Sequence, residues 1–104
     1  MTTTPPTIAF DCDETLWNNR EQKPNAKVVN LYRAFDAMGF KMIVWSAAGE
    51  EWAREVARRC GITPDLCKEK PPLDMYAGYV DLAIDDCEAC GRQNLLLPTK
   101  STND

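Results

Sequence analysis

Acidic residues gather at the ends of two short apolar segments of this sequence. The first segment, IAFDCDETLW at positions 8–17, places Asp11 and Asp13 one residue apart and adds Glu14. The second, LAIDD, ends in Asp85 and Asp86. Carboxylates this close repel one another, so the arrangement costs stability unless something neutralises it.

The absence of histidine and the odd number of cysteines further limit the chemistry that this chain can perform. The chain has no histidine, which excludes Ser-His-Asp and Cys-His catalysis and any zinc site that uses histidine. Its five cysteines, an odd number, favour reduced thiols in a cytosolic protein over a secreted disulfide framework. A four-cysteine zinc site is a weak alternative, because the spacing of its candidate ligands is not distinctive: Cys60, Cys67, Cys87 and Cys90.

Length and charge set further limits. With 104 residues the chain is expected to form one domain. Its net charge of −4 gives no basic footprint for general nucleic-acid binding, although a phosphorylated nucleic-acid end is not excluded. The sequence shows neither a signal peptide nor an apolar run of the roughly 18 residues that a membrane span needs, so we expect a cytoplasmic protein without a membrane partner.

Short apolar runs alternate with helical patterns along the chain. We expect strands at 7–11, 41–46, 65–68, 80–84 and 94–97, and helices at 24–38 and 50–60. Shorter helical segments are expected at 73–79 and 88–92. This alternation predicts a three-layer, Rossmann-like α/β fold with a mainly parallel five-stranded sheet. The domain should span 7–97, between a flexible arm at 1–6 and a loose tail at 98–104.

In such sheets, ligands bind beyond the carboxyl ends of the strands, where the strand order reverses. The polar residues of this sequence stand at those ends: Asp11 and Asp13 after the first strand, Ser46 after the second, and Asp85 and Asp86 after the fourth. The topology therefore predicts that four carboxylates and a hydroxyl converge at one edge of the sheet.

The order of these residues resembles the haloacid dehalogenase superfamily. The resemblance is carried by DCDETL at 11–16, Ser46 in VWSAAG, Lys70 in EKPPLD and the pair Asp85-Asp86 in LAIDD, and it covers residues 7–97. The Asp-x-Asp-x-Thr pattern alone would arise by chance in roughly one or two chains in a hundred of this size. The four motifs together, in the order of the family and each at the end of its expected strand or loop, are far more specific than this pattern alone.

The resemblance implies a phosphatase and gives roles to the residues of the first motif. Asp11 would be the nucleophile that forms an aspartyl-phosphate intermediate. Asp13 would be the general acid and base, protonating the leaving oxygen and later activating water. Thr15 would orient Asp13, although its hydroxyl could equally cap the next turn.

The resemblance also implies how phosphate and metal would be held. Ser46, Lys70 and the backbone N–H groups of Cys12, Asp13 and Ala47 would bind the phosphoryl oxygens. Mg²⁺ would be held by Asp11, the Asp13 carbonyl and Asp86, with Asp85 beside them, since a hard cation prefers oxygen ligands. A divalent ion would also relieve the repulsion between the carboxylates.

Several residues near the motifs have simpler interpretations. Lys68 is an alternative to Lys70 as the phosphate lysine, but Lys70 precedes Pro-Pro and better resembles the Lys-Pro of the family. Strand alternation directs Cys12 away from its aspartate neighbours, so we expect it to pack in the core. Trp17 and Trp52 are interpreted as packing or flap residues rather than substrate binders.

The sequence departs from the family pattern by its brevity. It has no room for a cap domain, and the loop after Thr15, where the family has a helical turn and a hairpin flap, is shortened to WNNREQKPN. An uncapped site suits a phosphate on a large molecule, such as a polynucleotide end or a phosphoprotein side chain, or a site closed by a second subunit.

Two other classes of function use the same residue types. One is a non-catalytic Mg²⁺- and phosphate-binding or phospho-acceptor module of the same fold, which the shortened flap favours. The other is a receiver domain, in which the phospho-acceptor follows the third strand rather than the first. We therefore expect a Mg²⁺-dependent phosphomonoester hydrolase, with the binding module as the alternative.

Overall fold

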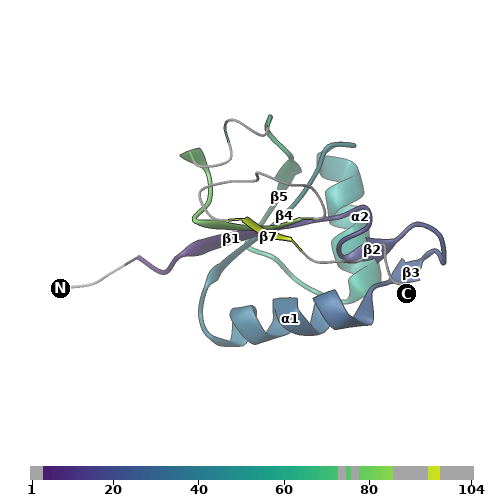
Figure 1. The fold of residues 1–104 in the computed structure, drawn as a ribbon, viewed down its shortest axis with the longest axis horizontal. Coiled ribbons are helices and arrows are strands. Elements are labelled where there is room, and N and C mark those ends of the chain that lie inside the picture. Colours follow the sequence, from purple (N-terminus) through teal and green to yellow (C-terminus); the bar gives the residue numbers. More distant parts are fainter. Residues whose placement is uncertain (1–3, 73–74, 76–77, 86–93, 97–104) are drawn as a thin grey trace.

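A parallel β-sheet forms the centre of the molecule. The structure is a computed structural model that describes residues 4–72, 75, 78–85 and 94–96 (Figure 1). Its strands are β1 (Thr7–Asp11), β4 (Lys41–Ser46), β5 (Leu66–Glu69), β6 (Leu82–Asp85) and β7 (Asn94–Leu96). They pair in the order β5-β4-β1-β6-β7, and every pairing is parallel. The predicted α/β class and mainly parallel sheet are confirmed for β5-β4-β1-β6.

The central strands follow the predicted bounds because both of their faces are buried. In β1, Ile8 and Phe10 join the larger core cluster, whereas Ala9 faces a second cluster on the other side. β4 alternates in the same way, with Val44 in the larger cluster and Trp45 in the smaller one. Apolar residues on both faces are typical of a strand at the centre of a parallel sheet.

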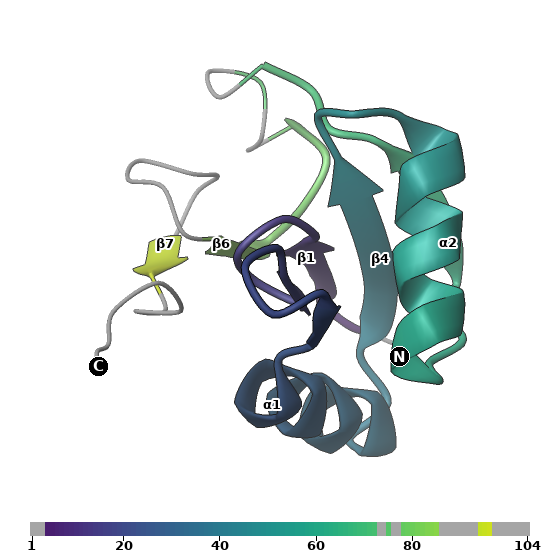
Figure 2. The same cartoon turned by 90° about the vertical axis from the view of Figure 1, so that its right-hand side faces the viewer.

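Both helices pack on one face of the sheet. α1 (Ala26–Ala37) and α2 (Glu50–Cys60) contribute Tyr32 and Val56 to the same cluster as Phe10. In Figure 2, α2 lies alongside β4 and α1 lies below β1. The chain passes from β1 to β4 to β5 in one direction across the sheet, so right-handed crossovers place both helices on the same side.

A smaller apolar cluster lies on the opposite face of the sheet. There, Val80 from the chain that leads into β6 packs on Ile43, Trp45 and Ala83. The helical segments expected at 73–79 and 88–92 lie mostly outside the described residues, and of the first only Met75 and 78–79 are described, with 3₁₀ geometry at Met75. Within the described part of the chain, helices therefore cover one face only.

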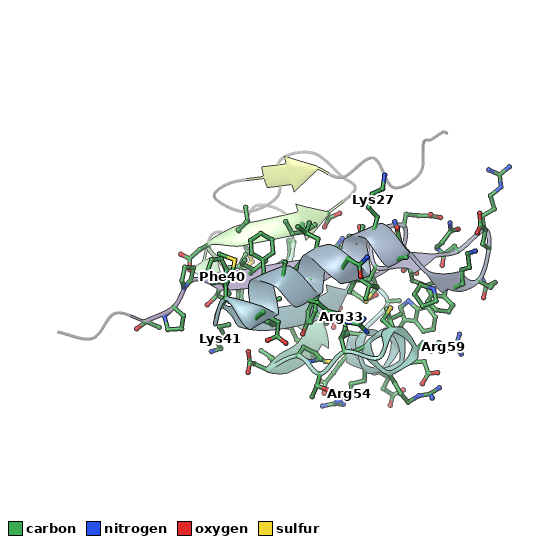
Figure 3. The ribbon with its side chains drawn as sticks, turned by 90° about the horizontal axis from the view of Figure 1, so that it is seen from below. Lys27, Arg33, Phe40, Lys41, Arg54 and Arg59 are labelled. Carbon is green, nitrogen blue, oxygen red and sulfur yellow. The ribbon has the colours of Figure 1, made fainter. Side chains whose placement is uncertain are left out.

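The helix ends show where the sequence patterns were accurate. α2 has the predicted bounds and ends at Gly61, whose left-handed φ of 71° suits glycine. α1 begins later than the expected residue 24, because Pro24 pairs with Trp17 in a hairpin. From α1, Arg33 extends toward α2 and donates a hydrogen bond to the Cys60 carbonyl at 3.4 Å (Figure 3).

A small hairpin follows β1, and its presence corrects the expectation of a merely shortened loop. β2 (Trp17–Asn18) and β3 (Lys23–Pro24) pair antiparallel. Figure 1 shows the hairpin beyond the carboxyl end of β1, and β3 contacts α2. Two-residue strands are too short to show a periodic pattern, so they could not be predicted from the sequence.

Two aspartates explain why β5 and β6 begin later than expected. Asp65 Oδ2 accepts a hydrogen bond from the Met42 N–H at 2.8 Å, and Asp81 Oδ2 accepts one from the Thr7 N–H at 2.9 Å. At these positions the aspartate side chains, rather than backbone carbonyls, accept from the N–H groups of β4 and β1. The regular strand pairing of β5 and β6 begins only after them. At the same edge, the Pro6 carbonyl accepts a hydrogen bond from the Lys41 N–H, which joins the last residue of the expected arm to the sheet.

No helix of the described residues combines the length and the apolar character that a membrane crossing requires.

Candidate active site

The candidate site lies where the strand order reverses. β1 has β4 on one side and β6 on the other, and the chain reaches these two neighbours in opposite directions across the sheet. Loops leave the carboxyl ends of adjacent strands on opposite faces at such a point, which is where α/β proteins bind ligands. Asp11 ends β1, Ser46 ends β4 and Asp85 ends β6, so the predicted convergence of these three residues is observed.

A lysine joins the two carboxylates at this point. Lys70 Nζ lies 3.1 Å from Asp11 Oδ1 and 3.3 Å from Asp85 Oδ2. The side chains of Asp11 and Asp85 are 7% and 1% exposed, and that of Lys70 is 16% exposed. Two buried carboxylates therefore lie against one largely buried ammonium group.

The backbone after β5 places Lys70 in this position. The Lys70 N–H donates to the Ser46 carbonyl at 2.9 Å, so the chain stays beside the end of β4 for one residue beyond the strand. Lys68 points elsewhere, with its Nζ 3.8 Å from the centre of the Tyr79 ring. Of the two lysines considered from the sequence, Lys70 is the one beside Asp11.

The first motif folds back on itself just after β1. The Cys12 carbonyl accepts hydrogen bonds from the N–H groups of Thr15 at 3.0 Å and Trp17 at 2.9 Å, and Glu14 adopts a left-handed φ of 63°. This turn brings the fully buried Thr15 back to the strand end, where its hydroxyl donates to Asp11 Oδ2 at 3.3 Å. Thr15 was expected to orient Asp13, whereas its observed hydrogen bond is to Asp11.

Asp13 has a partner that the sequence did not reveal. Trp52 of α2 donates its indole N–H to Asp13 Oδ1 at 3.0 Å. The two residues are 39 positions apart, and no local pattern links a helix residue to a carboxylate after a strand. The sequence had indicated only a packing or flap role for Trp52.

Ser46 and Ala47 lie at the end of β4, as expected. Ser46 is 1% exposed, and its Oγ accepts a hydrogen bond from the Ala48 N–H at 3.0 Å. Ala47 is exposed. One backbone N–H of this turn therefore contacts the buried Ser46 hydroxyl. Turns whose N–H groups point to one centre can bind an anion.

Cys12 packs in the core, as strand alternation predicted. It is fully buried in the cluster that contains Phe10. Burial, and then the negative charges of Asp11 and Asp13, raise the pKa of its thiol far above the usual value. A thiol that stays protonated is a poor nucleophile, so only the Cys12 backbone belongs to the candidate site.

Three of the four expected metal ligands, Asp11, Asp13 and Asp85, belong to the described residues. Asp86 lies outside the described residues, as do Cys87 and Cys90 of the alternative zinc site. Among the described residues, no group of three or more His, Cys, Asp or Glu side chains is arranged to hold a metal ion. The donors that are described, two buried carboxylates already converging on one cation, fit the preference of Mg²⁺ for oxygen ligands.

Comparison with known proteins adds no relative: no family model matches the chain, and neither does any curated protein.

Proposed function

We propose that this protein is a Mg²⁺-dependent phosphomonoester hydrolase of the haloacid dehalogenase type, acting through an aspartyl-phosphate on Asp11. The observation that carries the proposal is the placement of Lys70 between Asp11 and Asp85 at the switch point of the sheet. A cation next to a buried carboxylate offers a phosphoryl group both a nucleophile and a positive charge.

Asp11 is suited to attack phosphorus because both of its oxygens have defined contacts. Lys70 contacts Oδ1 and the Thr15 hydroxyl contacts Oδ2. The attack forms a bond between a carboxylate oxygen and phosphorus while the bond from phosphorus to the leaving oxygen breaks. Asp13 supplies the proton to that oxygen and then takes one from the water that hydrolyses the intermediate.

Ser46, Lys70 and the N–H groups of Cys12, Asp13 and Ala47 would bind the phosphoryl oxygens. Asp11, the Asp13 carbonyl and Asp86, with Asp85 nearby, would hold Mg²⁺. When bound, the ion would neutralise phosphoryl charge and let the dianionic substrate approach the carboxylates.

The finer features of the proposal are a five-stranded sheet of the haloacid dehalogenase kind, the absence of a cap domain and a cytoplasmic location. Only residues 12–25 separate β1 from α1, and only residues 70–81 separate β5 from β6, which supports the absence of a cap. We propose a phosphate on a large molecule as the substrate, with a second copy of the chain as an alternative means of closing the site.

The test is phosphate release from an aryl phosphate by the purified protein, with Mg²⁺ and with a chelator. We expect release only with Mg²⁺, and none from Asp11→Asn. Glu14→Gln is the matched control, because it makes the same carboxylate-to-amide change in the same loop at a residue without a role, and it should keep wild-type turnover. Equal turnover of wild type and Asp11→Asn would falsify the proposal.

The binding module gives a different result in the same assay. The small hairpin β2–β3, with two residues in each strand, favours this second candidate, since a short flap encloses a substrate poorly. Such a module would bind beryllofluoride with Mg²⁺ through Asp11 but turn over no phosphomonoester.

A further inference from the structure

We infer that Trp52 is a positioning residue for Asp13: its indole N–H fixes Oδ1 and thereby assigns Oδ2 to proton transfer with the substrate. The inference rests on the proposed function and goes beyond it by giving a role to a residue of α2. The contact that carries it is the 3.0 Å hydrogen bond from Trp52 Nε1 to Asp13 Oδ1.

The indole of Trp52 is itself held in place from two sides. Its ring meets the ring of Trp17 edge-on, with centroids 6.2 Å apart. The guanidinium of Arg59 lies 5.6 Å from the centroid of Trp52 and 5.2 Å from that of Trp17, and Glu55 pairs with Arg59 along the helix. A donor fixed by packing loses little entropy when it binds its acceptor, so it can define the orientation of Asp13.

Trp17 provides a natural comparison for this hydrogen bond. Trp17 is 3% exposed and packs on Trp52, yet its buried Nε1 has no hydrogen-bond partner among the described residues. Replacing either tryptophan by phenylalanine removes one indole N–H and leaves an aromatic ring. Only the change at position 52 removes a donor to Asp13.

The chemistry determines which substrates should respond. A leaving group that is a weak base, such as nitrophenolate, departs without help from a proton donor. An alkoxide leaving group must be protonated as the bond to phosphorus breaks, and here a positioned general acid matters most. Loss of the Trp52 hydrogen bond should therefore impair hydrolysis of alkyl phosphates selectively.

The kinetic experiment compares nitrophenyl phosphate with glycerol phosphate for the wild type, Trp52→Phe and Trp17→Phe, all with Mg²⁺. For Trp52→Phe we expect kcat/KM for the alkyl ester to fall about tenfold more than for the aryl ester, a part of the roughly 10²- to 10⁴-fold that general acids contribute. Trp17→Phe keeps an aromatic ring against Trp52 and removes no donor to Asp13, so it should change kcat/KM for both esters in the same proportion.

A second measurement detects the hydrogen bond without turnover and without a tryptophan variant. In the ¹⁵N–¹H spectrum, Asp13→Asn should move the Trp52 indole proton signal upfield, because an amide oxygen is a weaker acceptor than a carboxylate. The Trp17 indole signal should stay in place.

The possible failures are distinguishable. Two results would overturn this inference and leave the proposed function intact, provided that the wild type is active. One is an equal fall in kcat/KM for both esters in Trp52→Phe. The other is a Trp52 indole signal that does not shift in Asp13→Asn. A wild type that hydrolyses neither ester, with its hydrogen bond present by spectroscopy, overturns the proposed function and the positioning role with it.

Discussion

Lys70 is the residue on which the electrostatics of the site depend. It lies within 3.3 Å of both Asp11 and Asp85, and all three side chains are largely withdrawn from water. Buried carboxylates that face each other without a cation repel strongly and pay the cost of desolvation. The same ammonium group that would bind phosphate thus also stabilises the resting fold.

Replacing Lys70 should therefore lower stability as well as activity. We expect Lys70→Met to reduce the free energy of unfolding by about 3–5 kcal/mol, because it removes the ammonium group that lies against both buried carboxylates. Urea unfolding in the absence of Mg²⁺ measures this, and Lys70→Met combined with Asp85→Asn should recover part of the loss. Lys68→Met is the control, since Lys68 contacts only the Tyr79 ring among its described interactions, and an equal loss there would contradict the assignment.

Cys12 stands between two site carboxylates, yet its thiol should take no part in the reaction. Its pKa is raised by burial and by Asp11 and Asp13, and that of Cys60 is raised by burial to about 11. We expect Cys12→Ala to keep turnover of an aryl phosphate and to lose about 1 kcal/mol of stability, a typical effect of a core substitution. Iodoacetamide at pH 8 should leave both thiols of the native protein unmodified, as mass spectrometry can show; a folded but inactive Cys12→Ala would contradict this view.

At the scale of elements, α2 has a different role on each face. Its inner residues, such as Val56, pack on the sheet, and Trp52 reaches Asp13. Its outer side carries ion pairs between Glu55 and the arginines at 58 and 59, and Figure 3 shows Arg59 on this helix. Acidic residues in the first turn and basic residues in the last also suit the helix dipole.

The outer ion pairs predict an unusual titration. Hydrogen bonds from Arg58 and then Arg59 lower the pKa of Glu55 from 4.5 to about 2. Because the folded-state value lies below the unfolded one, the stabilising effect is fully present above pH 4.5 and is lost as the pH falls through about 2. Carboxyl ¹³C NMR should show the low midpoint in the wild type and a higher one in Arg58→Gln. A midpoint near 4.5 in both proteins would mean that these exposed pairs do not persist in solution.

For the whole molecule, sequence reasoning succeeded where a pattern was continuous and local. β1, β4 and α2 have their predicted bounds, because apolar runs and helical spacing end abruptly at polar residues or at Gly61. The convergence of Asp11, Ser46 and Asp85 could be predicted because the carboxyl ends of parallel strands lie at the same edge of a sheet. The hairpin β2–β3, the Thr15–Asp11 hydrogen bond and the Trp52–Asp13 contact depend on how a turn closes or how a helix docks, and short-range patterns carry no information about either.

Net charge is also a property of the whole molecule, and it bears on substrate choice. At −4, the protein repels polyanions at long range and attracts basic partners. At 0.1 M, salt screens charge interactions at separations greater than about 10 Å. Rising ionic strength should therefore change kcat/KM in opposite directions for substrates of opposite charge. If the proposed function holds, this charge predicts that a basic phosphopeptide is a better large substrate than a phosphorylated oligonucleotide.

This preference can be measured under the proposed function by varying NaCl at constant Mg²⁺. As salt rises, we expect kcat/KM to fall for a phosphopeptide flanked by lysines, because screening removes the attraction. It should rise for an oligonucleotide with a terminal phosphate, because screening removes the repulsion, while nitrophenyl phosphate serves as the small reference substrate. Parallel changes for all three substrates would show that local contacts at the site, rather than the field of the whole protein, determine which phosphate is accepted.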